Sequence, residues 1–452
     1  MLAGLARDGG LYVPSAWPRL DAHAIEALAG RPYAEAAFSV MSPFVGGEIA
    51  DHELRAVLRE AYAGFRHPAV APLVQIGPDS WILELFHGPT LAFKDIAMQV
   101  LARLMDRALE RRGRRATIIG ATSGDTGGAA IEAFRGCKTI DIYILHPKGR
   151  VSEVQRRQMT TASEPHVHAI AVDGTFDDCQ TIVKALFNDL DWRDRMQLAG
   201  VNSINWARVM AQIVYYFTAA VALGAPRRAV SFSVPTGNFG DIFAGYAASQ
   251  MGLPIERLII ATNENDILAR AVATGRYEPK GVKATQSPSM DIQISSNFER
   301  LLFELAQRDP ARVRALMADL AGNSLAELTR QETERLRLLF SAHAVSEAET
   351  RATIEGLYRS TGGLIVDPHT AVGLAAAGRE PHAHGTPIVT LATAHPAKFP
   401  DAIRAAIGRE PPEPEQVTRQ KNLKEKIVDV ANQAAAVAHL IESTARVARN
   451  PK

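Results

Sequence analysis

The sequence predicts an α/β protein with two doubly wound, mainly parallel α/β lobes, a helical N-terminal part and a C-terminal helix. Short apolar runs, which indicate buried strands, alternate with stretches of helical spacing along most of the chain. In two places a strand runs into a Gly-rich loop and then a helix, at 116–134 and at 229–250. Because these two units share one layout, we expect two lobes that face each other.

The N-terminal part is expected to cover residues 1–79. Apolar residues recur at helical spacing over 21–28, 32–41 and 51–62. Prolines and glycines break this pattern at 43–47 and 68–78.

The first lobe is predicted over 80–225. Its strands are expected at 81–86, 116–119, 140–145 and 168–172, and its helices at 94–113, 129–134, 181–190 and 206–223. The second lobe is predicted over 226–408, with strands at 229–234, 258–261 and 388–392, a helix at 242–251 and a charged helical insert at 298–358. The last part, 409–452, is expected to be a Pro- and Glu-rich linker at 409–418 followed by one amphipathic helix at 421–447.

Composition narrows the class of protein. The chain has 452 residues, 47% hydrophobic and 22% charged, which is typical of a globular protein with more than one domain. A net charge of +1 provides no field that would attract nucleic acid or an anionic membrane. Two cysteines suit a reducing compartment, and we find no apolar run of membrane-spanning length and no signal-peptide core. We therefore expect a cytoplasmic protein with no nucleic-acid or membrane partner.

Lys94 lies where a loop, His87-Gly-Pro-Thr-Leu-Ala-Phe-Lys-Asp95, enters an amphipathic helix. The positive end of the helix dipole disfavours a second positive charge at this position. The same repulsion lowers the pKa of the amine, which suits a nucleophile that forms a Schiff base. The alternative is a surface lysine whose stem covers the helix.

A second candidate is the loop Gly237-Asn-Phe-Gly-Asp241, between a strand and a helix. Glycines there let backbone N–H groups converge, and the helix dipole adds to them, so the loop can hold a phosphate. The loop lacks the lysine of a nucleotide P-loop and is not G-x-G-x-x-G. Asp241 is expected to cap the helix. The alternative is an ordinary tight turn.

Three further groups of polar residues follow strands or precede helices. The loop Thr122-Ser-Gly-Asp-Thr126 carries hydroxyls that suit a substrate anion, or that simply cap a turn. Asn202 and Asn205 precede a helix that carries Arg208, which can bind a phosphate with two hydrogen bonds, although the asparagines are equally suited to capping. Thr393 ends the last strand, where ligands bind in open α/β sheets. We expect no metal site, because the histidine pairs at 166/168 and 382/384 have no further ligand at metal-binding spacing.

Taken together, these stretches resemble threonine synthase, in the longer branch typical of bacteria and fungi. The resemblance spans about residues 3–401 and is carried by the motifs His87–Asp95, Ala121-Thr-Ser-Gly-Asp-Thr-Gly-Gly128, Gly237–Asp241 and Leu391-Ala-Thr-Ala-His-Pro-Ala-Lys-Phe399, with support from Gly4-Leu-Ala-Arg-Asp-Gly-Gly-Leu-Tyr-Val-Pro14 and Gly174-Thr-Phe-Asp-Asp-Cys179. Members of the family usually carry a short strand before the Gly4 motif, whereas this chain starts almost on the motif. We therefore expect a truncated N-terminus. The tail after Gly408 matches no pattern of the family.

The resemblance implies the tryptophan-synthase-β-like fold (fold type II) of pyridoxal 5'-phosphate (PLP) enzymes. It implies conversion of O-phospho-L-homoserine and water to L-threonine and phosphate, by a monomer or a homodimer. Lys94 would hold PLP as a Schiff base. The other cofactor-binding residues would be Asp125, Gly237, Asn238, Phe239, Gly240, Asp241 and Thr393, the last at the pyridine nitrogen. The substrate-binding residues would be Thr122, Ser123, Thr126, Asn202, Ser203, Asn205 and Arg208.

Three other functions stay open at this point. A dehydratase or phospholyase of the same fold would share Lys94 and differ in the set that binds the substrate phosphate, above all Arg208. A catalytically inactive metabolite-binding protein would not need Lys94. A nucleotide-binding protein would use the loop at 237–241.

Overall fold

The computed structural model describes residues 2, 4, 6, 8–122, 124–381 and 385–449. Its N-terminal part is helical, as the sequence predicts. It contains α1 (Ala22–Glu26), α2 (Tyr33–Val45) and α3 (Asp51–Tyr62). Helix α2 continues through Pro43 and ends at Gly46, whose φ of 58° is one that glycine adopts without strain. The apolar faces of α2 and α3 pack against the long central helices α4 (Lys94–Arg111) and α9 (Trp206–Ala222).

A six-stranded sheet forms the larger lobe. Its strands, in the order β1-β2-β12-β7-β8-β11, are β1 (Leu73–Gln75), β2 (Ser80–Glu84), β12 (Ile388–Ala392), β7 (Val230–Pro235), β8 (Ile255–Thr262) and β11 (Phe340–Ala344). Only β1 pairs antiparallel. The prediction that β2 belongs to the first lobe is wrong, since Ile82 pairs with Thr390 of β12. An apolar strand of five residues carries no signal that says which sheet it joins.

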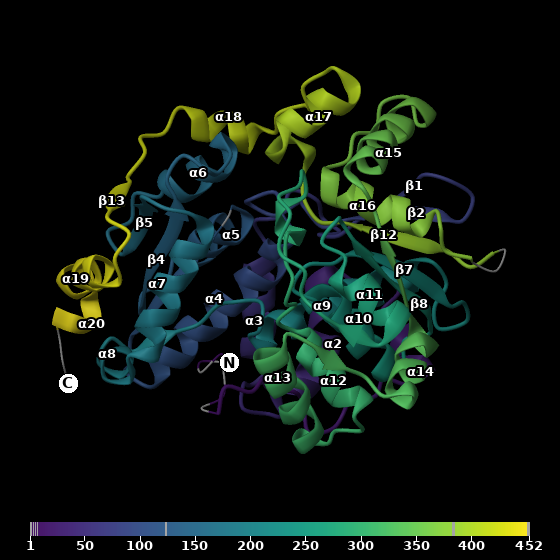
Figure 1. Cartoon of the computed structure of the whole chain (residues 1–452), viewed down its shortest axis with the longest axis horizontal. Helices are drawn as coiled ribbons and strands as arrows, with labels where there is room; N and C mark the ends of the chain where they lie inside the picture. The colour runs from purple at the N-terminus through teal and green to yellow at the C-terminus, as the bar shows by residue number, and fades with distance from the viewer. Residues whose placement is uncertain are drawn as a thin grey trace.

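A five-stranded parallel sheet forms the smaller lobe. Its order is β13-β5-β4-β3-β6, with β13 (Val428–Val430), β5 (Val167–Val172), β4 (Ile140–Pro147), β3 (Ala116–Ala121) and β6 (Leu198–Ala199). The helices of this lobe are α5 (Asp125–Phe134), α6 (Glu153–Thr160), α7 (Phe176–Asn188) and α8 (Leu190–Arg195). Figure 1 shows this lobe beside the larger one, with α4 and α9 between the two sheets.

The larger lobe also contains α10 (Gly240–Gln250), α11 (Ile267–Thr274), α16 (Pro368–Ala377), α17 (Pro400–Ile407) and the short turns η1 (Pro288–Met290) and η2 (Pro396–Lys398). The insert predicted as helical contains α12 (Phe298–Leu305), α13 (Pro310–Asn323), α14 (Arg330–Leu339) and α15 (Glu347–Ser360). It is not wholly helical, because β10 (Ala326–Glu327) pairs with β9 (Arg276–Tyr277), and β11 is the edge strand beside β8. In β11 only Phe340 is fully buried, so the strand has no apolar run to reveal it.

The C-terminal tail differs most from the prediction. Instead of one helix at 421–447, the tail forms α18 (Glu415–Lys421), β13, α19 (Ala434–Thr444) and α20 (Arg446–Arg449). Helix α18 also begins at Glu415, inside the stretch 409–418 predicted as a linker, and continues beyond it to Lys421. Figure 1 shows the tail leaving the larger lobe and crossing over the smaller one, where β13 adds a strand to the sheet and Arg446 pairs with the buried Asp141 at 2.8 Å. Both partners of the tail, β5 and Asp141, are distant from it in sequence. The prediction used only local apolar spacing, which favours a helix, and therefore missed them.

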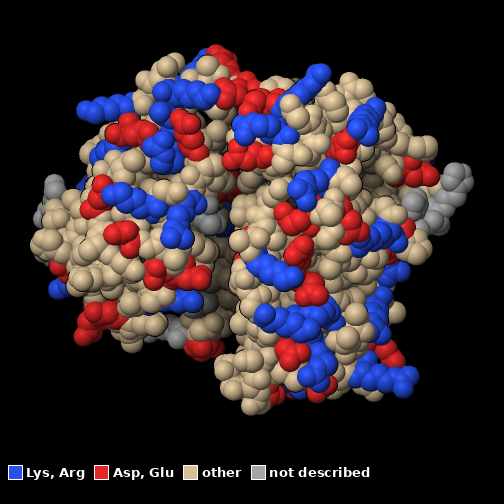
Figure 2. Space-filling view, turned by 45° about the horizontal axis from the view of Figure 1, so that its top comes forward, with Lys and Arg blue, Asp and Glu red and all other residues tan. Residues whose placement is uncertain are grey.

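On the face drawn in Figure 2, the described residues form no region of one charge that would indicate a polyanionic partner. Figure 2 shows acidic and basic side chains interspersed on the face drawn, which is hollowed along the boundary between the two lobes. Among the described residues, no helix is long and apolar enough to cross a membrane.

Candidate active site

The loop before Lys94 runs beside the carboxyl end of β12. The Phe93 N–H donates to the Thr393 carbonyl at 2.8 Å, and Ala92 forms an antiparallel bridge with Ala394. Lys94 is therefore the first residue of α4 and lies at the carboxyl end of the larger parallel sheet. This is the edge at which α/β proteins bind ligands.

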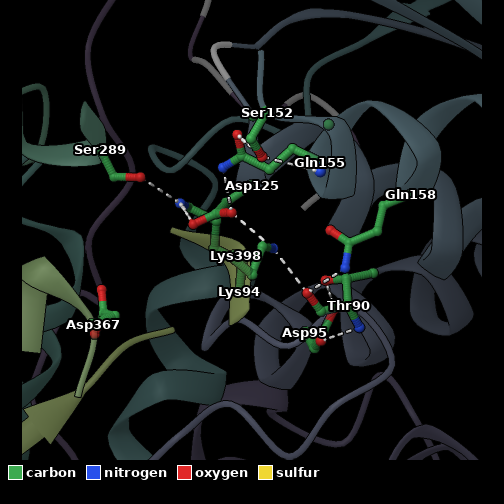
Figure 3. Close-up of polar contacts among 12 residues, drawn as sticks. Thr90, Lys94, Asp95, Asp125, Ser152, Gln155, Gln158, Ser289, Asp367 and Lys398 are labelled. Atoms are coloured by element: carbon green, nitrogen blue, oxygen red, sulfur yellow. Dashed lines mark hydrogen bonds and ion pairs between the residues drawn. The ribbon is translucent and has the colours of Figure 1, made fainter. Parts of the chain in front are cut away.

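Lys94 is buried among charged groups. Its Nζ lies 3.9 Å from Asp125 Oδ2 and 3.5 Å from Ser289 Oγ (Figure 3). Burial lowers its pKa to about 8, against the attraction of Asp125 and with the repulsion of Lys398 and Arg208. The lowered pKa agrees with the expectation from the sequence, but its main cause is loss of hydration.

Asp125 is the first residue of α5 and lies between two lysines. Its Oδ1 accepts from Lys398 Nζ at 2.7 Å and from Gln155 Nε2 at 2.9 Å. Burial acts to raise the pKa of Asp125, but the two ammonium groups outweigh burial and hold this pKa well below its usual range. The carboxylate is therefore ionised at neutral pH.

The same cluster fixes the loop before Lys94. The Thr90 N–H and hydroxyl both donate to the Asp95 carboxylate, at 2.8 and 2.7 Å, and Gln158 Nε2 donates to the Thr90 carbonyl at 2.9 Å (Figure 3). A Cβ at Gly88 would lie 2.4 Å from Asp95 Cβ, so only glycine fits there. Burial raises the pKa of Asp95 to about 6.

The sequence prediction missed Lys398, Gln155, Gln158 and Ser289. Of these, only Lys398 lay within a motif used for the resemblance, and its proximity to Asp125 depends on contact between the two lobes. The glutamines lie on α6, and no local pattern marks them.

The loop at 237–241 has the properties of an anion site. Its carbonyl groups at Gly237 and Asn238 accept from Ser295 Oγ and the Asn297 N–H, at 2.6 and 3.0 Å. In the part of the chain that the structure describes, the backbone N–H groups of residues 237–241 have no hydrogen-bond acceptor. Phe239 has a φ of 64°, and its buried ring packs edge-on against Phe298 with the ring centroids 5.1 Å apart. Consecutive free N–H groups at a helix start form a nest for an anion.

Ser289 connects this loop to Lys94. A Cβ at Gly237 would lie 2.5 Å from the Ser289 carbonyl oxygen, and Ser289 Oγ lies 3.5 Å from Lys94 Nζ. His369 Nε2 accepts the Ser289 N–H at 3.2 Å, and its Nδ1 contacts Asp367. The amine and the anion nest are thus two sides of one site.

Asp241 is not the helix cap that the sequence predicted. Its carboxylate accepts from the hydroxyls of Tyr215 and Tyr216 on α9, at 2.5 and 3.1 Å, and α10 has no side-chain cap. Burial raises the pKa of Asp241 to about 7. Only its backbone faces the nest, because the carboxyl group turns toward the protein interior.

In the loop at 122–126, the Thr122 hydroxyl already forms hydrogen bonds with nearby backbone groups. Thr122 Oγ1 accepts from the N–H groups of Gly124 and Gly127, at 3.0 and 2.9 Å, which favours the turn-capping alternative for this residue. Thr126 is half-buried on the first turn of α5. Ser123 lies outside the described residues.

Arg208 is the clearest candidate for binding a substrate anion. Its guanidinium is buried, donates to the Val201 carbonyl at 3.2 Å, and leaves Nε without a partner. None of the described carboxylates forms an ion pair with it, and burial lowers its pKa to about 10, so it remains charged. A buried unpaired cation is costly unless an anion joins it.

The residues before Arg208 divide into different roles. Asn205 caps α9 by accepting the Ala207 N–H at 3.1 Å, which favours the capping alternative. Asn202 is exposed, and Ser203 Oγ lies 3.5 Å from Ser296 Oγ, beside the nest. Thr393 is buried, and its carbonyl holds the loop before Lys94.

Comparison with known proteins identifies relatives along the whole chain. Family models match for the N terminus of threonine synthase at residues 1–62, for pyridoxal-phosphate-dependent enzymes at 66–332, and for the C-terminal part of threonine synthase at 370–441. The last match extends into the tail, which the sequence reasoning could not place.

Individual relatives agree with these models. Threonine synthase of Pseudomonas aeruginosa is 53% identical over 97% of this chain and 93% of its own length. The PLP-bound crystal structure of threonine synthase from Brucella melitensis superposes with a TM-score of 0.96 at 56% identity, covering 98% of this chain and 95% of that one. The crystal structure of threonine synthase from yeast superposes with a TM-score of 0.92 at 40% identity, covering 98% of this chain and 94% of that one.

Proposed function

Because this chain belongs to the threonine synthase family of PLP-dependent enzymes, we propose that it converts O-phospho-L-homoserine and water to L-threonine and phosphate. In this reaction the bond between Cγ and the phosphate oxygen breaks, water supplies a hydroxyl to Cβ, and Cγ becomes a methyl group. The observation that carries the proposal is the joining of Lys94 to the nest at 237–241 through Ser289.

The residues fit PLP. The nest supplies free N–H groups for a phosphate ester, and Ser289 contacts both the Lys94 amine and the start of that nest at Gly237. When bound, PLP withdraws electrons from the substrate carbons, so that protons leave the α- and β-carbons more readily. Thr393, at the carboxyl end of β12, is the residue we assign to the pyridine nitrogen, and Asp125 lies beside the amine.

Lys94 is suited to moving those protons. An amine with a pKa of about 8 exchanges a proton near neutral pH far more readily than one at the usual lysine value. Burial keeps water away from the amine, and Asp125 stabilises its charged form. Lys94 thus accepts a proton at Nζ and returns it within one site.

Arg208 is assigned to the substrate phosphate. The site contains three cations, Lys94, Lys398 and Arg208, near one fully ionised carboxylate, Asp125. This excess of positive charge suits a dianionic leaving group together with the phosphate of PLP. We also assign Ser203, beside the nest, and the backbone of the loop at 122–126 to the binding of the substrate phosphate.

The proposal is tested by measuring threonine and phosphate release from O-phospho-L-homoserine, with O-phosphoserine as the control substrate. We expect both products in equal amounts from the former, and at least tenfold slower phosphate release from the latter. Faster release from O-phosphoserine would instead indicate a phospholyase. Arg208→Leu should raise KM for O-phospho-L-homoserine by about tenfold or more, since a charged hydrogen-bonded partner is lost.

We also propose a cytosolic location. Both cysteines, Cys137 and Cys179, are free and buried, which suits a reducing compartment. Fractionation of cells that express the full-length protein tests this, with the protein expected in the soluble cytosolic fraction.

A further inference from the structure

Lys398 is a fully buried lysine to which the proton transfers described above assign no individual role. It ends η2, just after β12 in the larger lobe. Its Nζ donates to Asp125 Oδ1 of the smaller lobe at 2.7 Å and to the Thr90 carbonyl at 2.8 Å. A buried ammonium group is costly unless it is paired. Lys398 therefore joins the two lobes at the site through Asp125, and it also holds the loop before Lys94 through Thr90 (Figure 3).

The contacts of Asp125 are unequal. Oδ1 receives Lys398 and Gln155 within hydrogen-bond distance, whereas Oδ2 lies 3.9 Å from Lys94 Nζ, beyond that distance. Lys398 is thus the resident partner of the carboxylate, and Lys94 is its second, looser neighbour. The looser geometry leaves the Lys94 amine free to turn toward a ligand.

The charge on Lys94 must change during proton transfer, and this makes the second lysine important. If Lys94 were the only cation beside Asp125, loss of its proton would leave a buried carboxylate without a cationic partner, which burial strongly disfavours. With Lys398 in place, Asp125 stays paired whether Lys94 is charged or neutral.

We propose that Lys398 is a positioning residue, which keeps Asp125 ionised and fixed so that Lys94 can gain and lose a proton without disturbing the site. The proposal rests on the proposed function only in taking Lys94 as the reacting amine. Lys398 acts on Lys94 through their shared neighbour Asp125 and through electrostatic repulsion between the two ammonium groups.

The direction of the effect follows from the groups that face Lys94. Lys398 and Arg208 favour its neutral form, and Asp125 and Asp95 favour its charged form. Removal of the Lys398 charge takes away one repulsion. It also frees Asp125 to pair closely with Lys94, so both changes make Lys94 hold its proton to higher pH.

The test is a pH titration of the visible absorption band of the holoenzyme, which reports protonation at the Lys94 nitrogen. In Lys398→Gln, which removes the charge, we expect the midpoint to rise by about one pH unit or more. In Lys398→Arg, which keeps the charge, the pH midpoint should stay within about 0.3 pH units of the wild-type midpoint. An unchanged midpoint in a folded Lys398→Gln protein would overturn the proposal. Lys398→Met is the second uncharged variant if the glutamine variant does not fold.

A second measurement separates this inference from the proposed function. In the full-length protein freed of PLP, the rate at which an amine reagent labels Lys94 is followed against pH by peptide mass spectrometry. We expect a midpoint near 8 in the wild type and a higher one in Lys398→Gln. A wild-type midpoint near the ordinary value of about 10.4 would contradict the charge arrangement. If Lys94→Ala retained the visible band, the proposed function itself would fail, whereas an intact band with unshifted titration would remove only the role of Lys398.

Discussion

The two strand–Gly loop–helix units look alike in sequence and behave differently in the structure. Each ends a parallel strand, and each places an aspartate on the first turn of a helix, Asp125 in one and Asp241 in the other. Asp125 faces two lysines, so its pKa is held low, whereas Asp241 faces two tyrosines in an apolar interior, and burial raises its pKa to about 7. The same local motif therefore supplies an ionised carboxylate in one lobe and a carboxyl group that is about half protonated at neutral pH in the other.

The two loops also differ in their backbones. In the smaller lobe the Thr122 hydroxyl accepts two loop N–H groups, whereas in the larger lobe the N–H groups of residues 237–241 have no acceptor among the described residues. The first loop presents a carboxylate to Lys94, and the second presents an anion nest. The partner that the tertiary fold brings to each loop, more than the motif itself, therefore decides the chemistry of that loop.

The largest expected effect separates the two aspartates. Asp125→Asn should lower kcat/KM by about 100-fold, because it removes the carboxylate that pairs with Lys398 and faces Lys94. Asp241→Asn should lower kcat/KM by less than about tenfold, since an amide resembles the half-protonated acid. Steady-state kinetics on both purified variants test this, with circular dichroism as the check on folding. Equal losses would break the distinction between the loops.

Asp241 should also make stability depend on pH. Its folded pKa of about 7 exceeds the unfolded value of about 3.9, so the folded state holds this proton more tightly. The resulting stability is fully present below pH 4 and is lost as pH rises through 7. Between pH 5.5 and 7.5 the wild type should lose about 2 kcal/mol of unfolding free energy relative to Asp241→Asn. Denaturant unfolding at both pH values measures the difference, and parallel curves for the two proteins would contradict it.

A matched pair of glycines tests the nest. Gly237→Ala should weaken PLP binding by about tenfold or more, because the added Cβ would lie 2.5 Å from a backbone carbonyl of Ser289 and must displace it. Gly120→Ala, within the last residues of β3 in the smaller lobe, meets Ile144 Cδ1 at 3.4 Å and should change binding less than twofold. Equilibrium titration of PLP into each protein provides the affinities. A tolerated Gly237→Ala would place the nest elsewhere.

The smallest expected effect concerns the two threonines that follow the strands. Thr122→Val should destabilise the protein by about 1–2 kcal/mol, because two buried N–H groups lose their acceptor. Thr236→Val removes a single donor to the Val234 carbonyl and should cost about 0.5–1 kcal/mol. Thermal melting at fixed pH ranks the two variants, and a reversed order would mean that the Thr122 loop is held by other contacts.

Sequence reasoning located most elements and the lysine that we propose as the reacting amine. Strands β3, β4, β5, β7, β8 and β12 and helices α2, α3, α4 and α9 lie where apolar periodicity predicts them. Lys94, the loop at 237–241 and Arg208 stand out because a lysine at a helix start, glycines after a strand, and an arginine in an apolar helix are locally unexpected. The shared motif order then allowed the family to be recognised.

The alternation of strands and helices, the position of Lys94 and the family can be read from the amino-acid sequence, because each depends on neighbours within a few residues or on ordered motifs. Contacts between distant parts of the folded chain decide that β2 joins the larger sheet, that β13 extends the smaller one, that Asp241 turns toward Tyr215, and that Lys398 reaches Asp125. Those outcomes depend on which groups burial brings together across long stretches of chain. Burial also sets the pKa values on which the chemistry depends.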